Sequence, residues 1–494
     1  MTTDQHIVSS RGLLSRSARY RGRRGFTWAS LLLFGVLVTA SLLRTTGHGA
    51  FSSIDEDAHF DYAYVLTAGS LPPTGDQPTR ALTREIFVCR GGLGNTWPVL
   101  IACTDDHDTA GFPFGGRSRA LGNPPTWYLL AAGGILVAAP AGVDPLTAAR
   151  TVGILTFGAG SVLLLWALRA FRIALAPAIG VTLLVASLPN AFYLGGFAMP
   201  HSGYLLAGSG LLLIAVAFIR RPRWSLAAAL VLGCALAMLV MPHMVAAVTC
   251  ACALVALAGL AALPRTGRSP QPPGTQRGGS PPPPTTVGPE WLPALTWPML
   301  AGAAGLAGLL AWAGMSRLRG SLGLNGASGL SGTGGTGGTG LVNVAAPNPY
   351  AVPPATLAEQ VLQWLRIGPG GQVMFAHREW NATNTLDLWW NPVTALAVAL
   401  AGAAMVWALL GRDVPRVHRL LAAATLIGLA VAVLGINRAF WMTLEELPLR
   451  YYAAATPALA ILIAALARRP AAAWALTGVG GLAFLAVYTT GPLW

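Results

Sequence analysis

Residues 26–47, FTWASLLLFGVLVTASLLRTTG, form a run of 22 mostly apolar residues without an acid. A helix needs about 20 such residues to cross a bilayer. An arginine-rich tail precedes the run, and the acidic sequence IDEDAHFDY, residues 54–62, follows it. We therefore expect a membrane-spanning helix here, with residues 1–25 as a basic cytoplasmic tail.

The whole chain has the composition of a membrane protein. Of its 494 residues, 54% are hydrophobic and 10% are charged, and the mean hydropathy is +0.57. This composition excludes a soluble globular protein with a polar surface. It predicts an all-α polytopic membrane protein with about eleven transmembrane helices, at residues 26–47, 148–168, 176–198, 202–219, 225–242, 244–263, 297–315, 392–410, 420–437, 451–467 and 471–489.

The charges predict the orientation of these helices, because arginines accumulate in short cytoplasmic loops. With a cytoplasmic amino terminus and an extracytoplasmic carboxyl terminus, the inner segments hold 19 of the 32 basic residues and 3 of the 18 acids. We therefore expect a multi-pass protein of the plasma membrane in contact with the lipid bilayer. The basic excess is spread over short loops, so nucleic acid is not an expected partner. All basic residues are arginine, which is typical of GC-rich genomes such as those of actinobacteria.

The long polar segments divide the chain into modules. We expect an amino-terminal transmembrane module at 26–263, which includes an extracytoplasmic loop at 48–147. A proline-rich segment at 264–296 is predicted to be a cytoplasmic linker. A carboxyl-terminal transmembrane module at 297–494 includes a second extracytoplasmic loop at 316–391.

A twelfth apolar segment, 125–141, lies inside the first loop. If it were counted as a span, the arginine clusters that follow it would lie on the extracytoplasmic side instead of the cytoplasmic side. We expect a juxtamembrane helix on the outer leaflet, since its start carries Trp127 and Tyr128, which suit an interface. A hairpin pair that enters the membrane twice is the alternative.

The acids after the first span are the strongest functional signal. Asp55, Glu56 and Asp57 lie at the predicted outer boundary of the membrane, followed by His59. A carboxylate at this depth can take a proton from a hydroxyl group that attacks a lipid-linked substrate. The alternative is a set of solvated interface charges.

Several features in a fixed order resemble the GT-C superfamily of glycosyltransferases, which use polyprenyl-phosphate sugars. These are the acidic step after span one, a long outer loop, a Pro-Pro-x-Trp-Tyr segment, and Ala148-Ala149-Arg150 opening the second span. The strings Asp55-Glu56-x-Ala58-His59-Phe60 and Leu449-Arg450-Tyr451-Tyr452 look like a poorly characterised bacterial branch with an Asp-Glu-Pro-Ala-His-Phe motif. The resemblance is best over the first 220 residues and implies a GT-C-like fold.

The resemblance implies roles for matching residues. Asp55 is the first candidate for the catalytic base and Glu56 the second, and His59 would orient an acid or the phosphate. Arg450 with Tyr451 would bind the phosphate, because guanidinium binds phosphate oxygens in a fork.

Three positions depart from the pattern. Position 57 is aspartate where the branch has proline, and position 449 is leucine where it has glycine. His201 stands where many relatives have an acid or asparagine. We keep Asp57 and His201 as candidate substrate-binding residues.

The acidic residues of the first outer loop are also candidates for binding a divalent cation. Asp55 and Asp57 with His59, or the cluster Asp105-Asp106-His107-Asp108, supply hard ligands suited to Mg²⁺ or Mn²⁺. Both clusters also fit solvated loop charges, and the resemblance does not decide between these interpretations.

The five cysteines fall into two groups. Cys89 and Cys103 lie in the first outer loop, an oxidising compartment, and are candidates for a disulfide, with two free thiols as the alternative. The others lie inside apolar spans and are expected to be packing residues.

The expected function is inverting transfer of a monosaccharide from a polyprenyl-phosphate donor to a cell-envelope glycan or glycolipid, on the extracytoplasmic face. The alternatives are a transporter or flippase of lipid-linked sugars and a non-catalytic accessory subunit. A transporter is expected to carry charged or broken-helix sites near the bilayer centre.

Overall fold

In the computed structural model, every regular element of the described residues is helical. The structure describes residues 7–45, 49, 51–52, 56–69, 81–90, 120, 123–188, 191, 195–241, 244–261, 296, 299, 302, 305, 385–440 and 453–490. In chain order its elements are α1 (Ile7–Thr45), α2 (Glu56–Leu66), α3 (Ala81–Cys89), α4 (Thr126–Ala138), η4 (Ala139–Ala141), α5 (Pro145–Ala170), α6 (Leu175–Ala186), η5 (Pro200–Gly203), α8 (Tyr204–Arg220), α9 (Trp224–Val240), α10 (Val245–Leu260), α14 (Thr385–Leu410), α15 (Arg416–Phe440), α16 (Thr456–Leu466) and α17 (Pro470–Thr490).

The helices confirm a multi-pass membrane protein. Five are long and apolar enough to cross a bilayer: Arg24–Thr45, Pro145–Ala170, Pro200–Arg220, Pro392–Leu410 and Pro470–Thr489. Shorter apolar helices accompany them, and large apolar side chains such as Leu32 and Leu410 point outward with at least 70% of their surface exposed. Such exposure fits contact with lipid tails. The count of eleven spans stays a prediction, since most of 297–315 lies outside the described residues.

Several elements differ from the predicted spans. For example, α14 begins at Thr385 instead of 392, and α16 covers Thr456–Leu466 instead of 451–467. The helix predicted at 176–198 ends at Ala186, because Pro189 disfavours helical backbone at the residue before it. The predicted tail at 1–25 is helical from Ile7 and continues into the span. By contrast, the segment at 125–141 is a helix as expected, formed by α4 and η4.

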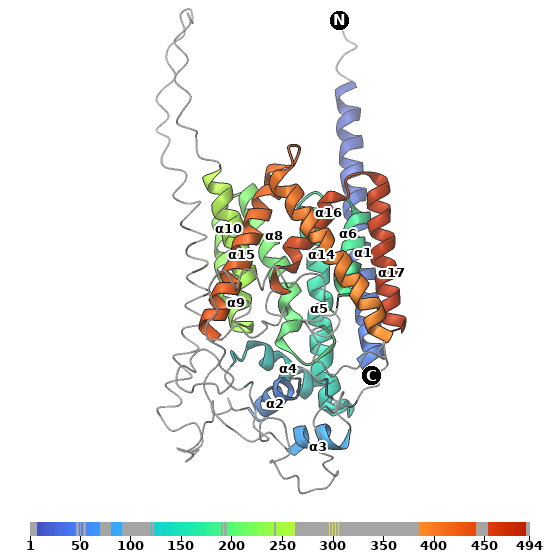
Figure 1. Ribbon diagram of the computed structural model, residues 1–494, viewed down its shortest axis with the longest axis vertical. Helices are drawn as coiled ribbons and strands as arrows, with labels where there is room; N and C mark the ends of the chain where they lie inside the picture. Colours follow the sequence, from blue (N-terminus) through green and yellow to red (C-terminus); the bar gives the residue numbers. More distant parts are fainter. Residues whose placement is uncertain are drawn as a thin grey trace, which may run out of the picture.

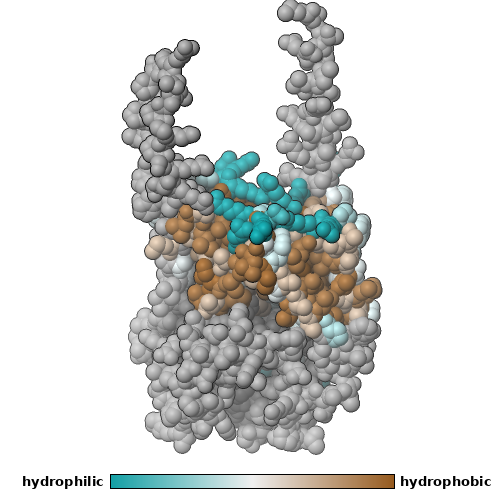
Figure 2. Space-filling model, turned by 45° about the horizontal axis from the view of Figure 1, so that its top comes forward, coloured by the Kyte–Doolittle hydropathy of each residue, from teal (hydrophilic) through white to brown (hydrophobic). Residues whose placement is uncertain are grey.

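One end of the bundle carries the basic turns (Figure 1). The ring of His418 on α15 lies 6.0 Å from that of Phe171 at the end of α5, and 6.3 Å from that of Trp407 on α14. Arg468, before α17, stacks over Trp407 at 4.7 Å. These contacts gather the ends of four helices. Figure 2 shows a hydrophilic layer above the apolar band at this end. The exposed arginines at or near these helix ends are Arg24, Arg172, Arg220, Arg221, Arg223, Arg412, Arg416, Arg419, Arg468 and Arg469.

The opposite end of the bundle carries α2, α3 and α4 (Figure 1). Their apolar side chains form a second core, separate from that of the bundle, with Phe60 on α2, Trp127 and Tyr128 on α4, and Ala149 on α5. All four are at most 1% exposed. The acids of these helices and of the start of α5 are therefore held against the end of the bundle and away from the arginine-rich turns.

Glycines allow the closest helix contacts. A Cβ atom at Gly480 on α17 would collide with the carbonyl oxygen of Gly180 on α6, and one at Gly180 would lie 2.6 Å from the carbonyl oxygen of Leu476. Small residues let membrane helices approach backbone to backbone, where packing replaces the hydrophobic effect as the force that associates them. The close approach of α6 and α17 therefore requires glycine at positions 180 and 480.

We expect Gly480→Ala to lower the stability of the protein by about 1–3 kcal/mol, because the added methyl group forces the two helices apart. Gly478→Ala is the matched control, since Gly478 on the same helix is exposed and has open space where a Cβ would lie. Thermal unfolding in a neutral detergent measures both. An equal loss in the two variants would refute the close-contact explanation.

Candidate functional site

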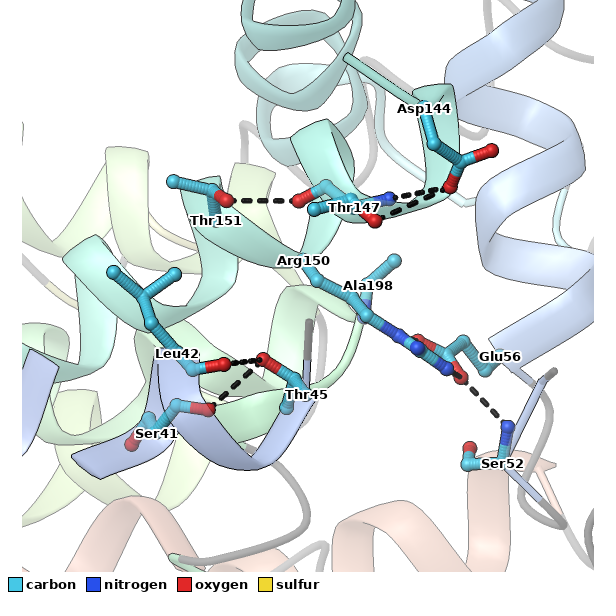
Figure 3. Close-up of polar contacts among 10 residues, drawn as sticks. All are labelled: Ser41, Leu42, Thr45, Ser52, Glu56, Asp144, Thr147, Arg150, Thr151 and Ala198. Carbon is cyan, nitrogen blue, oxygen red and sulfur yellow. Dashed lines mark hydrogen bonds and ion pairs between the residues drawn. The ribbon is translucent and has the colours of Figure 1, made fainter. Parts of the chain in front are cut away.

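Glu56 is the centre of a polar junction at the end of the bundle (Figure 3). Its side chain is fully buried in the first turn of α2. Its Oε1 accepts hydrogen bonds from Nε of Arg150 at 2.8 Å and from the backbone N–H of Ala198 at 2.9 Å. Its Oε2 accepts from Nη2 of Arg150 at 2.8 Å and from the backbone N–H of Ser52 at 2.7 Å. Each carboxylate oxygen therefore has two donors.

Arg150 supplies the ion pair from the second turn of α5. Arg150 is 1% exposed, and the central carbon of its guanidinium lies 5.5 Å from the ring centre of Phe197. Arg150 and Glu56 form a bidentate pair, which is the strongest arrangement of hydrogen bonds between a guanidinium and a carboxylate. Together with Ser52 and Ala198, the pair joins α2 and α5 to the segments that follow α1 and α6.

This geometry favours a positioning role for Glu56 over the predicted role of second base. A base must offer a lone pair to the hydroxyl proton that it removes. The oxygens of Glu56 already accept four hydrogen bonds from buried donors. Removing one donor would leave a buried polar group unsatisfied, which typically costs about 1–3 kcal/mol.

His59 lies one helical turn beyond Glu56 and contacts α4. Its Nδ1 is 2.8 Å from the hydroxyl of Tyr128, which also accepts a hydrogen bond from Nδ2 of Asn123 at 3.0 Å. Either Nδ1 of His59 or the phenol can be the donor of their hydrogen bond, because the role of the ring nitrogen depends on its tautomer.

His201 is brought beside His59 although 142 positions separate them. It lies in η5 and is 4% exposed, and the two imidazole rings meet edge to face with centres 6.0 Å apart. The neighbouring Ser202 accepts a hydrogen bond from Nε1 of Trp127 at 3.2 Å, which ties η5 to α4. Two of the predicted substrate-binding residues thus share one buried site.

Asp61 is a buried acid that the sequence analysis did not single out. It lies on α2, fully buried, and accepts a hydrogen bond from the hydroxyl of Thr83 on α3 at 2.8 Å. Asp57 is half-buried. Arg150 and Tyr128 were also not assigned roles, although an arginine in an apolar helix is a recognisable signal for a polar site in a membrane protein.

The predicted metal site has little support from the described part of the chain. Within it, no group of three or more His, Cys, Asp or Glu side chains gathers as metal ligands would. Nδ1 of His59 is engaged by Tyr128, and the carboxylate of Glu56 is engaged by Arg150. Asp55 and the cluster at 105–108 lie outside the described residues, so we derive no step through a metal.

Two other predicted site residues, Arg450 and Tyr451, also lie outside the described residues. The chain is described again from Ala453, and Ala453–Ala455 are buried. A Cβ at Gly208 on α8 would lie 2.5 Å from the carbonyl oxygen of Ala454. The start of α16 is therefore packed tightly against α8.

Cys89 is disulfide-bonded, as expected for one half of the predicted pair. Its predicted partner, Cys103, lies outside the described residues. Cys234, Cys250 and Cys252 are free, and the first two are buried.

Asp144 links Arg90, which follows α3, to the start of α5. As its N-cap it accepts hydrogen bonds from the backbone N–H and the hydroxyl of Thr147, and Nη1 of Arg90 pairs with it at 2.8 Å. Burial acts to raise the pKa of Asp144. The hydrogen bonds from Arg90 and Thr147 outweigh it and hold the pKa below the ordinary value of 3.8.

Because the folded-state pKa of Asp144 is depressed, its contribution to stability is present above pH 3.8 and is lost as the pH falls through the folded-state pKa. We expect Asp144→Ala to cost about 1–2 kcal/mol at pH 7, from the lost cap and the lost ion pair. Asp144→Asn, which can still cap, is expected to lose less and to show a weaker fall in melting temperature on acidification. Melting curves from pH 7 to pH 3 test this, and identical acid profiles for the Asp144→Asn variant and wild type would contradict it.

The chain matches no known protein family, no curated protein and no solved structure in the comparisons made. The site is therefore interpreted from its own geometry.

Proposed function

We propose that the protein is a GT-C-like membrane glycosyltransferase that transfers a monosaccharide from a polyprenyl-phosphate donor to an envelope glycan or glycolipid. The observation that carries the proposal is the anchoring of Glu56 by four hydrogen bonds at a junction of four chain segments. Asp55 directly precedes Glu56 in the chain. A carboxylate base needs such a fixed support at the membrane boundary.

The proposed orientation places the arginine-rich end in the cytoplasm and α2 to α4 on the extracytoplasmic side. The described acids support it, because Glu56, Asp57, Asp61, Glu85 and Asp144 belong to α2, α3 and the start of α5. Asp413 is the described acid in an arginine-rich turn. In this orientation, with eleven spans, the amino terminus is cytoplasmic and the carboxyl terminus is extracytoplasmic.

In the proposed reaction, Asp55 takes the proton from the acceptor hydroxyl as its oxygen attacks the anomeric carbon. The bond from that carbon to the phosphate oxygen breaks, and polyprenyl phosphate leaves with the bonding electrons. Direct displacement inverts the anomeric configuration. Arg450 and Tyr451 bind the departing phosphate, and His59 orients an acid or the phosphate.

The test is sugar transfer by purified protein in nanodiscs, with a panel of radiolabelled polyprenyl-phosphate sugars and envelope acceptors. Parallel samples with EDTA decide whether a divalent cation takes part. Transfer or release of the sugar from one donor supports the proposal. Donor binding without any sugar movement would instead support a flippase, a transporter or an accessory subunit.

A further inference from the structure

Arg172 adopts a backbone conformation that arginine rarely takes. It has φ of 64°, and it is the one non-glycine residue with a positive φ in the described part of the chain. It follows α5 in a Schellman turn, where the N–H of Arg172 bonds to the carbonyl of Arg169 and the N–H of Ile173 to that of Leu168. Glycine usually occupies this position, because a Cβ is strained there. An arginine kept at a strained position suggests that its side chain has a role.

A second guanidinium lies beside this turn. Arg220 ends α8, and its Nη2 donates to the carbonyl oxygen of Ala170, two residues before Arg172. Both side chains are exposed.

Nothing acidic in the neighbouring sequence offsets this pair. The chain has no aspartate or glutamate between Asp144 and Glu290, which covers every residue of α5, α6, α8, α9 and α10. In the described residues, the acid at this end is Asp413, in the turn between α14 and α15. Two exposed guanidinium groups at neighbouring helix ends, on helices that contain no acid, favour an anion from outside the chain.

The depth of the pair indicates which anion is available. The apolar span Pro145–Ala170 ends two residues before Arg172, and the apolar span Pro200–Arg220 ends at Arg220 itself. Trp224, which is 74% exposed, begins the next helix. Tryptophan at such a position is typical of headgroup depth. Figure 2 shows that hydrophilic residues lie above the apolar band at this end of the bundle.

We propose that Arg172 and Arg220 bind the phosphate of an anionic phospholipid headgroup. Guanidinium groups match phosphate oxygens with paired hydrogen bonds, and basic residues at the membrane surface attract anionic lipids. The binding site joins the end of α5 to the end of α8, so an occupied site stabilises the contact between these helices. It is separate from the polar junction around Glu56, at the other end of the bundle.

The test titrates phosphatidylglycerol into protein in a neutral detergent and follows the melting temperature, with phosphatidylcholine and inorganic phosphate as parallel additives. Arg172→Gln removes the charge and keeps the strained backbone. Arg172→Gly removes both. Arg412→Gln removes one exposed charge from the same end, at the turn between α14 and α15, and is the matched control.

Without lipid, we expect Arg172→Gly to melt about 1–3 °C above wild type, because the strain is relieved. Arg172→Gln is expected to melt near wild type. With phosphatidylglycerol, both variants at position 172 should show an apparent affinity about fivefold weaker, the equivalent of about 1 kcal/mol for one arginine. Arg412→Gln should respond like wild type.

Two outcomes would overturn the proposal. In the first, the variants at position 172 respond to phosphatidylglycerol as wild type and Arg412→Gln do. In the second, phosphatidylcholine or inorganic phosphate stabilises wild type as much as phosphatidylglycerol does, which would assign the pair to a zwitterionic lipid surface or to a soluble anion.

Discussion

Arg150→Met is expected to destabilise the protein by about 3–5 kcal/mol, because it leaves the carboxylate of Glu56 buried without its ion-pair partner. Both residues are at most 1% exposed. Methionine retains most of the volume of the arginine side chain, so the loss reports the missing charge and hydrogen bonds more than a cavity. Thermal and denaturant unfolding in detergent measure it.

A second ion pair of the same length provides the control. Nη1 of Arg90 lies 2.8 Å from Asp144, but the side chains are 29% and 30% exposed. Exposed pairs contribute about 0–1 kcal/mol, so we expect Arg90→Met to cost far less than Arg150→Met. Similar losses in the two variants would show that burial does not govern the strength of the pair at Glu56.

The double variant Glu56→Gln with Arg150→Met tests the mechanism further. If the loss in Arg150→Met comes from an uncompensated charge, removing that charge as well should restore part of the stability. A double variant that is less stable than Arg150→Met alone would point instead to the hydrogen bonds from Ser52 and Ala198 as the main contribution.

Asp55→Asn is expected to lower the rate of sugar transfer by about 10²–10⁴-fold, because asparagine has the shape of aspartate and does not accept the proton of the acceptor hydroxyl. The melting temperature is expected to stay near that of wild type, since the anchoring carboxylate is that of the next residue, Glu56. Initial rates with the donor identified in the transfer assay measure the effect. Equal donor binding by variant and wild type would place the loss in the chemical step.

Asp57→Asn is the matched control for this result. Asp57 is half-buried on the first turn of α2, two residues from Asp55. We expect it to affect substrate binding more than turnover. If Asp57→Asn abolishes transfer while Asp55→Asn remains active, the base is Asp57.

Local features of the chain predicted the fold class. The length and hydropathy of 26–47 are properties of neighbouring residues, so they indicate a spanning helix whatever surrounds it. The same holds for the helix at 125–141, whose aromatic residues mark its start. The end of α6 at Ala186 was missed, although Pro189 gave a local signal, because a window of apolar residues continued beyond it.

The acids after the first span are visible in the sequence, whereas their partners are determined by the tertiary structure. Nothing in the sequence pairs Glu56 with Arg150, 94 residues away, or places His59 against His201. A helix in lipid satisfies its backbone hydrogen bonds within its own segment. The sequence of that segment alone therefore shows whether it is long and apolar enough to span the membrane. A buried carboxylate instead requires donors from any segment that packing brings near, and the fold therefore determines whether Glu56 anchors the site or is available as a base.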